Sequence, residues 1–239
     1  AVFRDQTFWI SLQHTFVFVI ASVMLETLLG LGLALLAKEP TRASRATRVL
    51  LLLPWAIPPV ANGLVWSFIF DSKYGYLNVA LHRLGFIDEF VRWLGDPSLA
   101  MLAVITAYVW RTTPFTALLL YAALRGIPDE LYDAAEVDGA GAWQRFRAIT
   151  LPLLVPTLTV ALVLRTTFAF MVFDEIFALT QGGPGNATWV AGWYVYRHAF
   201  QPPFEIGIAA ASAYVLAMII AVFAFLYIWL ARRAPGAEW

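Results

Sequence analysis

The chain has 239 residues, of which 61% are hydrophobic and only 13% are charged. Soluble domains are typically about 45–50% apolar and about 25% charged, so this chain has too few polar groups to cover a water-exposed surface. Lys and Arg balance Asp and Glu at 16 each, which leaves no basic face large enough for nucleic acid. The lack of cysteine excludes disulfides, thiolate metal sites and a cysteine nucleophile. The composition therefore indicates an integral membrane protein.

Five stretches of the sequence are long and apolar enough to cross a membrane as helices. A span of roughly 20 apolar residues covers the hydrocarbon layer, and none of these stretches shows the two-residue alternation of a barrel strand. We therefore expect an all-α, polytopic membrane protein, with residues 1–239 forming one transmembrane domain. The expected spans are Phe16–Ala37, Val49–Phe70, Leu99–Leu124, Leu151–Phe173 and Ile206–Ala231.

The distribution of Lys and Arg predicts the orientation of these spans, because cytoplasmic loops are enriched in both. Segments 38–48 and 125–147 and the C-terminal tail together carry nine, against five in the other connecting segments. We expect the nine-charge side, including the loop 126–150 and the C-terminus, to be cytoplasmic. Five spans then place Ala1 outside, and since residues 1–8 do not resemble a signal peptide, we expect a further span before Ala1.

Three prolines, Pro54, Pro58 and Pro59, interrupt the second expected span. Each lacks a backbone donor and clashes with the preceding turn, so this helix should kink or unwind near the middle of the membrane. Such a break either is accommodated by neighbouring helices or forms a gate or a binding wall.

Two long segments on the outer side have different patterns. In 71–98, apolar residues at helical spacing predict two short interfacial helices with aromatic anchors, one around Leu77–Leu84 and one around Phe90–Leu94. In 174–205, the run Gln181–Asn186 is a strong turn cluster. This turn is either a plain connector or a docking loop for a partner.

The loop 126–150 is predicted to be a helix–turn–helix. Pro128 followed by Asp129 suits the start of a helix, and Gly139 suits a left-handed C-terminal cap. A second short helix is expected over Trp143–Ile149. We expect the pair to lie across the cytoplasmic ends of the spans, with small side chains leaving a shallow surface that a partner can approach closely.

The same loop resembles the EAA loop of ABC importer permeases. Asp133 stands where that family has its leading Glu, which keeps the charge and shortens the side chain by one methylene. This resemblance implies a coupling helix that docks in a groove of an ATPase. The matching residues, spaced over twenty positions, are Asp133, Ala134, Ala135, Asp138, Gly139, Ile149, Leu151 and Pro152.

The resemblance covers nearly the whole chain. Leu53–Pro58, Trp110–Phe115 and Phe173–Pro184 are similar to the carbohydrate-type branch, specifically its maltose/glycerol-phosphate first-permease type. The resemblance implies a type I permease of six helices, five of them visible here, in a bacterial or archaeal cytoplasmic (inner) membrane. It also implies four kinds of partner besides lipid: a second permease, two ATPase subunits that hold ATP and Mg, an extracytoplasmic solute-binding protein and a sugar-like solute. This chain itself is expected to bind no cofactor and no metal.

Three charged residues, Glu26, Arg111 and Arg165, lie inside apolar spans, where a charge costs roughly 2.5–3.5 kcal/mol on insertion scales. They either form structural ion pairs or line a solute pathway, and the resemblance places the solute beside the two spans that flank the coupling loop. The candidate pathway residues on these spans are Tyr108, Arg111, Thr112, Phe115, Arg165, Phe168, Ala169 and Val172. If the outer turn cluster docks the binding protein, its candidate contacts are Gly182, Gly183 and Pro184.

Two other classes of membrane protein fit the sequence less well than an importer subunit. An ion-coupled secondary transporter would need buried acids for coupling, but Glu26 is the only carboxylate within an expected span. A membrane enzyme would need an acid/base pair or a metal cluster near one interface, and the sequence shows none. Because it also has no Gly-Lys-Ser/Thr phosphate loop, ATP hydrolysis is expected from a partner and this chain is expected to be a non-catalytic permease subunit.

Overall fold

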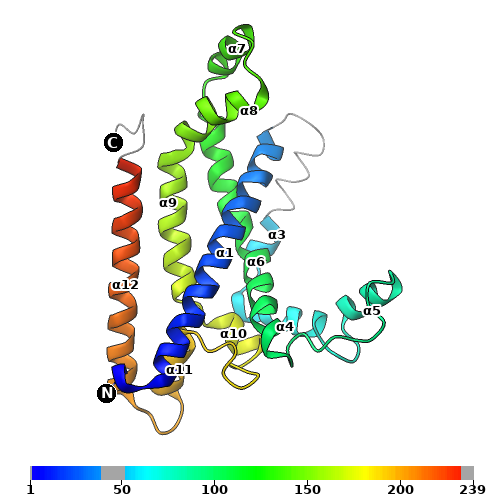
Figure 1. The fold of residues 1–239 in the computed structure, drawn as a ribbon, viewed down its shortest axis with the longest axis vertical. Coiled ribbons are helices and arrows are strands. Elements are labelled where there is room, and N and C mark those ends of the chain that lie inside the picture. The colour runs from blue at the N-terminus through cyan, green and yellow to red at the C-terminus, as the bar shows by residue number, and fades with distance from the viewer. Residues whose placement is uncertain (1, 39–51, 233–239) are drawn as a thin grey trace.

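The computed structural model describes residues 2–38 and 52–232, and the regular structure within these ranges is entirely helical. Four long helices run along the length of the molecule (Figure 1). They are α1 (Gln6–Lys38), α6 (Pro97–Arg125), α9 (Leu151–Phe170) and α12 (Ile206–Arg232). The shorter elements are η1 (Val2–Arg4), α3 (Leu52–Ala56), α4 (Pro59–Ile69), α5 (Tyr76–Arg83), α7 (Asp129–Val137), α8 (Ala142–Arg145), η2 (Phe146–Thr150), α10 (Asp174–Leu179) and α11 (Ala191–Phe200).

Within the described residues, three helical stretches are both long and apolar enough to cross a membrane: Gln6–Lys38, Ala142–Phe170 and Ile206–Arg232. α6 coincides with the third expected span and has 29 residues, although Arg111 and several threonines make it more polar than the other three. The fourth expected span, Leu151–Phe173, extends beyond the observed helix. α9 ends at Phe170, and the chain then turns into α10. Most of the expected loop 38–48 and the tail beyond Arg232 lie outside the described residues.

The second expected span is broken, as its prolines predict. α3 ends at Ala56 and α4 begins at Pro59, with Pro58 as its N-cap. α4 is then held by contacts with two other helices: Asn62 Nδ2 donates to the carbonyl of Ala107 in α6 at 3.1 Å, and Gly63 lies directly against Ala178 of α10. The break thus lets α4 leave the direction of α3 and pack against α6 and α10.

Segment 71–98 contains one of the two short helices expected there. α5 forms as predicted and projects to the side of the bundle (Figure 1), but the helix expected around Phe90–Leu94 is wrong, since this stretch is irregular. The Asn78 side chain explains the difference. It accepts from the backbone N–H of Val91 at 3.1 Å and from Trp93 Nε1 at 2.9 Å, and it donates to the Val91 carbonyl at 2.9 Å, so these groups are satisfied without a helix.

The core lies where α1, α6 and α9 meet, and it contains fully buried aromatic side chains such as Phe18 and Phe170. α1 and α6 approach each other closely, because a Cβ added at Gly30 would lie 2.9 Å from Thr116 Cγ2. By contrast, α12 packs mainly against α9 and α11 and leaves most of its apolar side chains exposed. An apolar helix with so much exposed surface suits contact with lipid or another subunit.

The elements separate into two ends of the bundle. α7, α8 and the end of α12 lie at one end, whereas η1, α10 and α11 lie at the other (Figure 1). The predicted coupling loop and the last described residue, Arg232, are therefore on the same side, as the charge distribution predicts.

The close contact at Gly30 gives a test of this packing. Gly30→Ala should lower stability by about 1–3 kcal/mol, because the added methyl overpacks the α1–α6 contact. Gly32→Ala, two residues along the same helix, is the matched control, since a Cβ there meets nothing within 4 Å. The measurement is the melting temperature of both purified variants in mild detergent. Equal melting temperatures would show that α1 and α6 are not packed as described.

Candidate coupling loop and intramembrane charge cluster

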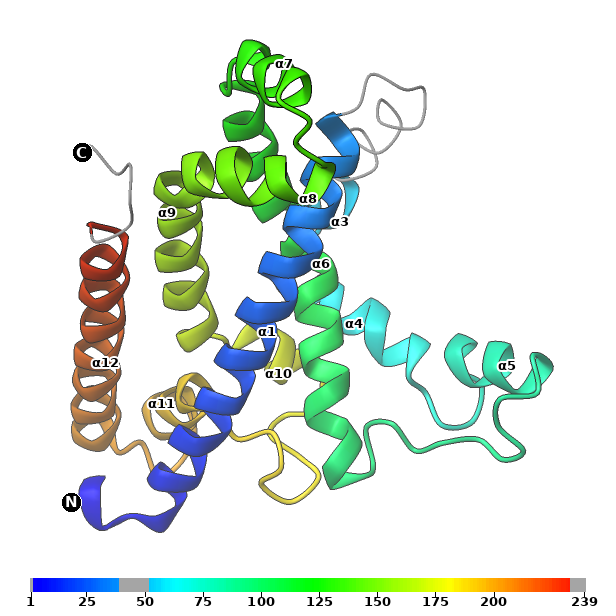
Figure 2. The same ribbon diagram turned by 45° about the horizontal axis from the view of Figure 1, so that its top comes forward.

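α7 has no buried residue and stands clear of the bundle (Figures 1 and 2). Leu131 is 44% exposed and Val137 is 88% exposed, and Ala134 between them is also exposed. A helix of 9 residues is marginal without tertiary contacts. Its exposed apolar side therefore suits a protein partner.

The end of α7 is closed by a left-handed glycine, as predicted. Gly139 has φ +78°, and its N–H donates to the Glu136 carbonyl at 3.0 Å. The next N–H, of Ala140, donates to the Ala135 carbonyl at 2.8 Å. These are the two bonds of a Schellman motif, and the motif reverses the chain direction after α7.

The second short helix is not separate, contrary to prediction. α8 continues through the π-helical turn η2 directly into α9, so Ala142–Phe170 is one continuous helical stretch. Figure 2 shows α8 lying across the end of the bundle and then turning into α9. Pro152 provides the physical reason for the wide turn, because it has no N–H to donate to the Ala148 carbonyl.

The residues of the EAA-like signature divide into two groups. Asp133, Ala134, Asp138 and Gly139 are exposed, and Ala135 is half-buried. The others, which are Ile149, Leu151 and Pro152, are half-buried where η2 joins α9. The first group therefore forms surface, and the second group forms the start of a transmembrane helix.

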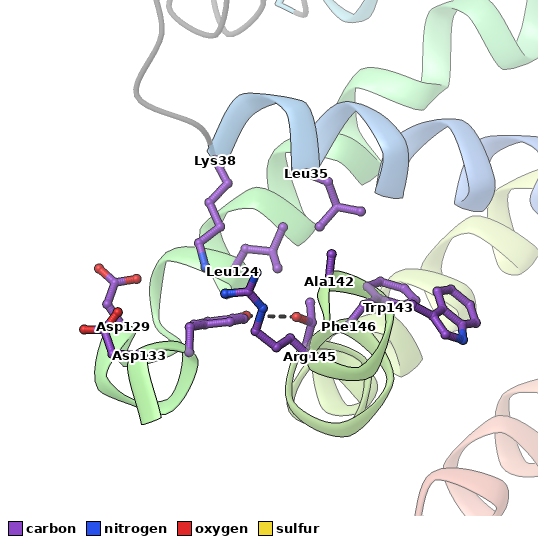
Figure 3. A pocket seen from close by; sticks show the side chains of 11 residues that line it. Leu35, Lys38, Leu124, Asp129, Asp133, Ala142, Trp143, Arg145 and Phe146 are labelled. Carbon is purple, nitrogen blue, oxygen red and sulfur yellow. Dashed lines mark hydrogen bonds between the residues drawn. The ribbon is translucent and has the colours of Figure 1, made fainter. Parts of the chain in front are cut away.

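An open cavity of about 930 Å³ separates α7 from the ends of α1 and α6 (Figure 3). Two basic side chains, Lys38 and Arg145, and two acidic ones, Asp129 and Asp133, line it. The other lining residues are Leu35, Leu124, Tyr132, Ala142, Trp143, Phe146 and Thr150. Among the described residues, no group of three or more His, Asp or Glu could hold a metal ion.

Glu26 and Arg165 form a buried ion pair between α1 and α9. Arg165 Nε donates to Glu26 Oε2 at 2.5 Å, and Arg165 Nη2 donates to Glu26 Oε1 at 3.1 Å. Glu26 Oε1 also accepts from Thr112 Oγ1 of α6 at 2.6 Å, and Arg165 Nη2 donates to Tyr108 Oη at 3.2 Å. Since the side chains are 0% and 7% exposed, each charge is neutralised within this chain.

A second ion pair joins α6 to α10. Arg111 Nε and Nη2 both donate to Glu175 Oε1, at 2.8 and 2.7 Å. Tyr108 lies between the two ion pairs. The centre of its ring is 5.8 Å from the Arg111 guanidinium and 5.6 Å from that of Arg165. Sequence reasoning missed Glu175 because it follows the apolar window. An unpaired Arg111 in a span was the signal that such a counter-ion was needed.

The candidate pathway residues do not form the two continuous faces that their spacing predicts. Arg165 and Ala169 point into the core, whereas Phe168 is 56% exposed, because spacings of three and four residues cover a wide arc of a helix. Val172 is buried beyond the end of α9. On α6, Tyr108 and Thr112 are also buried. Of the candidates, those that reach the surface are Arg111, Phe115 and Phe168.

The turn cluster Gln181–Asn186 exposes its residues to different extents. Gly182 has φ +86° and is buried, and a Cβ there would lie 2.5 Å from Trp189 Nε1 and 2.6 Å from Trp193 Nε1. Gly182 therefore allows the loop to pack on two indole rings. Gly183 and Pro184 are half-buried, and Gly185 and Asn186 are exposed at the tip.

Comparison with known proteins gives a consistent result. A family model described as binding-protein-dependent transport system inner membrane component matches residues 26–234. The trehalose/maltose transport system permease protein MalF of Thermococcus litoralis is 40% identical over 231 residues, which cover 97% of this chain and 77% of MalF. The sulfoquinovosyl glycerol transport system permease protein SmoG of Agrobacterium fabrum is 39% identical, with 90% of this chain and 69% of SmoG covered.

A solved structure supports the same relationship. A chain of a bacterial alginate ABC transporter, solved in complex with an alginate pentasaccharide-bound periplasmic protein, superposes with a TM-score of 0.86. Its sequence is 27% identical, and the match covers 100% of this chain and 83% of that one.

The buried pair of Glu26 and Arg165 predicts a specific pattern of stabilities. Arg165→Ala should cost roughly 3–5 kcal/mol, because it leaves a buried carboxylate without its partner. The double variant with Glu26→Ala should recover much of that loss. Yield and melting temperature in detergent, measured for both single variants and the double, would check this. Losses that simply add in the double variant would contradict the pairing.

Proposed function

Because the chain belongs to the family of binding-protein-dependent transport system inner membrane components, we propose that it is the transmembrane permease subunit of an ATP-driven importer. Its solute is a sugar or a related polar compound, since relatives at 39–40% identity are named for trehalose/maltose and for sulfoquinovosyl glycerol. The observation that carries the proposal is α7, a short helix with no buried residue, displayed at one end of a membrane bundle.

Several partners follow from this function. A second permease completes the pore, and two ATPase subunits bind the ATP and Mg that this chain does not hold. An extracytoplasmic binding protein delivers the solute; the similar alginate transporter was solved with its periplasmic protein. The chain itself is non-catalytic, and its part is to convert ATPase movement into alternating access.

The shape of the coupling loop supports this role. The ATPase groove would take the outward side of α7, with Leu131, Ala134 and Val137. Behind α7, the continuous helix Ala142–Phe170 leads from the loop to Arg165. A displacement of α8 is therefore passed along α9 to the core and towards α10.

We place the solute pathway on the surface-reaching members of the predicted set. Arg111 uses Nε and Nη2 on Glu175, which leaves Nη1 to donate to solute hydroxyls, and Phe115 and Phe168 offer aromatic surface for sugar rings. Phe115 stacks on the exposed Trp55 of the broken span at a centroid distance of 6.0 Å, which extends this aromatic surface. Arg165 has a structural role, because it donates hydrogen bonds to Glu26 and Tyr108.

An ion-coupled secondary transporter fits the described structure less well. Coupling ions or protons need a carboxylate that can exchange its partner. Both buried carboxylates, Glu26 and Glu175, are held by arginines. An arginine keeps its charge at any working pH, so each of these carboxylates keeps a charged partner within the chain.

The proposed orientation has α7 and the C-terminal end of α12 in the cytoplasm. A cysteine at Ala142 should then react with an impermeant thiol reagent only after the membrane is opened, whereas a cysteine at Asn186 should react from outside. Each variant would carry a single cysteine, since the native chain has none. The reverse labelling pattern would invert the orientation and remove the ATPase dock.

Coupling should depend on the left-handed glycine after α7. A valine in that conformation costs at least about 1–2 kcal/mol, so Gly139→Val should lower solute-stimulated ATP hydrolysis by roughly ten-fold. Solute binding to the separate binding protein should be unchanged. Gly141→Val is the matched control, because Gly141 has φ −69°, which valine adopts readily. Full stimulation in the Gly139 variant would show that this cap has no part in coupling.

A further inference from the structure

α7 is attached to the rest of the chain through two of its side chains. Tyr132 and Glu136 lie one helical turn apart on the side opposite Leu131 and Ala134. Glu136 Oε2 accepts from Arg145 Nη1 of α8 at 2.6 Å, and Tyr132 contacts two other elements. The open cavity lies on the same side, so packing elsewhere does not hold α7 in place.

Tyr132 joins α7 to the end of α1 and to the residue before the start of α9. Its hydroxyl is 2.9 Å from Thr150 Oγ1, and Thr150 is a buried residue directly before α9. Lys38, the last residue of α1, holds its Nζ 3.8 Å from the centre of the Tyr132 ring. The ring also packs beside the buried cluster that contains Leu124 and Leu154. One side chain thus contacts α1, α9 and the core.

The ion pair of Glu136 with Arg145 is a weaker and more local attachment. Its side chains are 71% and 27% exposed, and exposed ion pairs contribute little to stability. It also joins α7 only to α8, within the same loop. The attachment of α7 to the transmembrane helices therefore depends on Tyr132.

We propose that Tyr132 is the positioning residue that transmits movement of the coupling helix to α1 and α9. The proposal deepens the proposed function and rests on it. When an ATPase displaces α7, the hydrogen bond to Thr150 draws the start of α9 with it, and the contact with Lys38 draws the end of α1. The cavity beside Tyr132 leaves α7 room to tilt about this side chain.

Tyr132→Phe tests the proposal with the least change, because it removes the hydroxyl and keeps the ring beside Lys38. The complex of this chain with its second permease and ATPases would be reconstituted in lipid vesicles with the loaded binding protein. Solute imported per ATP hydrolysed should fall roughly three- to ten-fold, the equilibrium factor of one lost hydrogen bond. Tyr76→Phe, an exposed position on α5, is the matched control and should match the wild type.

Thr150→Val removes the same hydrogen bond from the other side. It should lower the import ratio to a similar extent, and the double variant should be no worse than either single variant, because the two groups act through one bond. Subunit yield and melting temperature would be measured in parallel. A purely structural role would change those two quantities and leave the import ratio of the assembled complex unaltered, which would overturn the proposal.

The remaining outcomes distinguish the proposed role of Tyr132 from the proposed function of the chain. If Tyr132→Phe leaves the solute imported per ATP hydrolysed unchanged, and loaded binding protein stimulates the wild type normally, the proposed role of Tyr132 is wrong and the proposed function stands. A wild-type complex that hydrolyses no additional ATP in response to loaded binding protein would overturn both the proposed function and the proposed role of Tyr132.

Discussion

A charge inside an apolar layer must be neutralised by the protein itself, and the described core is arranged around that constraint. Glu26 on α1 is held by Arg165 on α9 and by Thr112 on α6, so three of the long helices meet at one carboxylate. Arg111 and Glu175 extend the same arrangement to α10. Without these partners each charge would oppose insertion, and with them the charges specify which helix faces meet.

The end of the bundle that carries α7 differs from this core, because the chain leaves the surface of α7 uncovered. α7 buries none of its residues, and its shape depends on local features: the left-handed Gly139 at one end of the turn and Pro152 where the chain enters α9. These features define the loop without a core of its own. The stabilising surface is left for a partner, which suits the proposed role of a subunit that follows the movement of an ATPase.

The two regions are connected by α9, and this connection constrains the proposed solute pathway. α9 begins at the coupling loop, carries Arg165 in its second half and ends before α10. Arg165 is buried and committed to Glu26, so it is not free to select a solute by its hydroxyls. Arg111 is paired with Glu175, but its side chain is 14% exposed, so the proposed selection falls to Arg111, Phe115 and Phe168. An aromatic surface with few fixed charges is consistent with relatives named for chemically different sugars.

The sequence by itself determined the features that depend on near neighbours along the chain. The prolines predict the break between α3 and α4, and Gly139 predicts the end of α7, because both act through the local backbone. The spans and the EAA-like signature are local for the same reason. Only the tertiary structure decided which distant side chains meet: Arg165 with Glu26, and Arg111 with Glu175. It also decided that Asn78 holds 91–93 in an irregular path and that Gly182 packs on indole rings. Helical spacing defines an arc of possible directions, and the packing of other helices selects one of them.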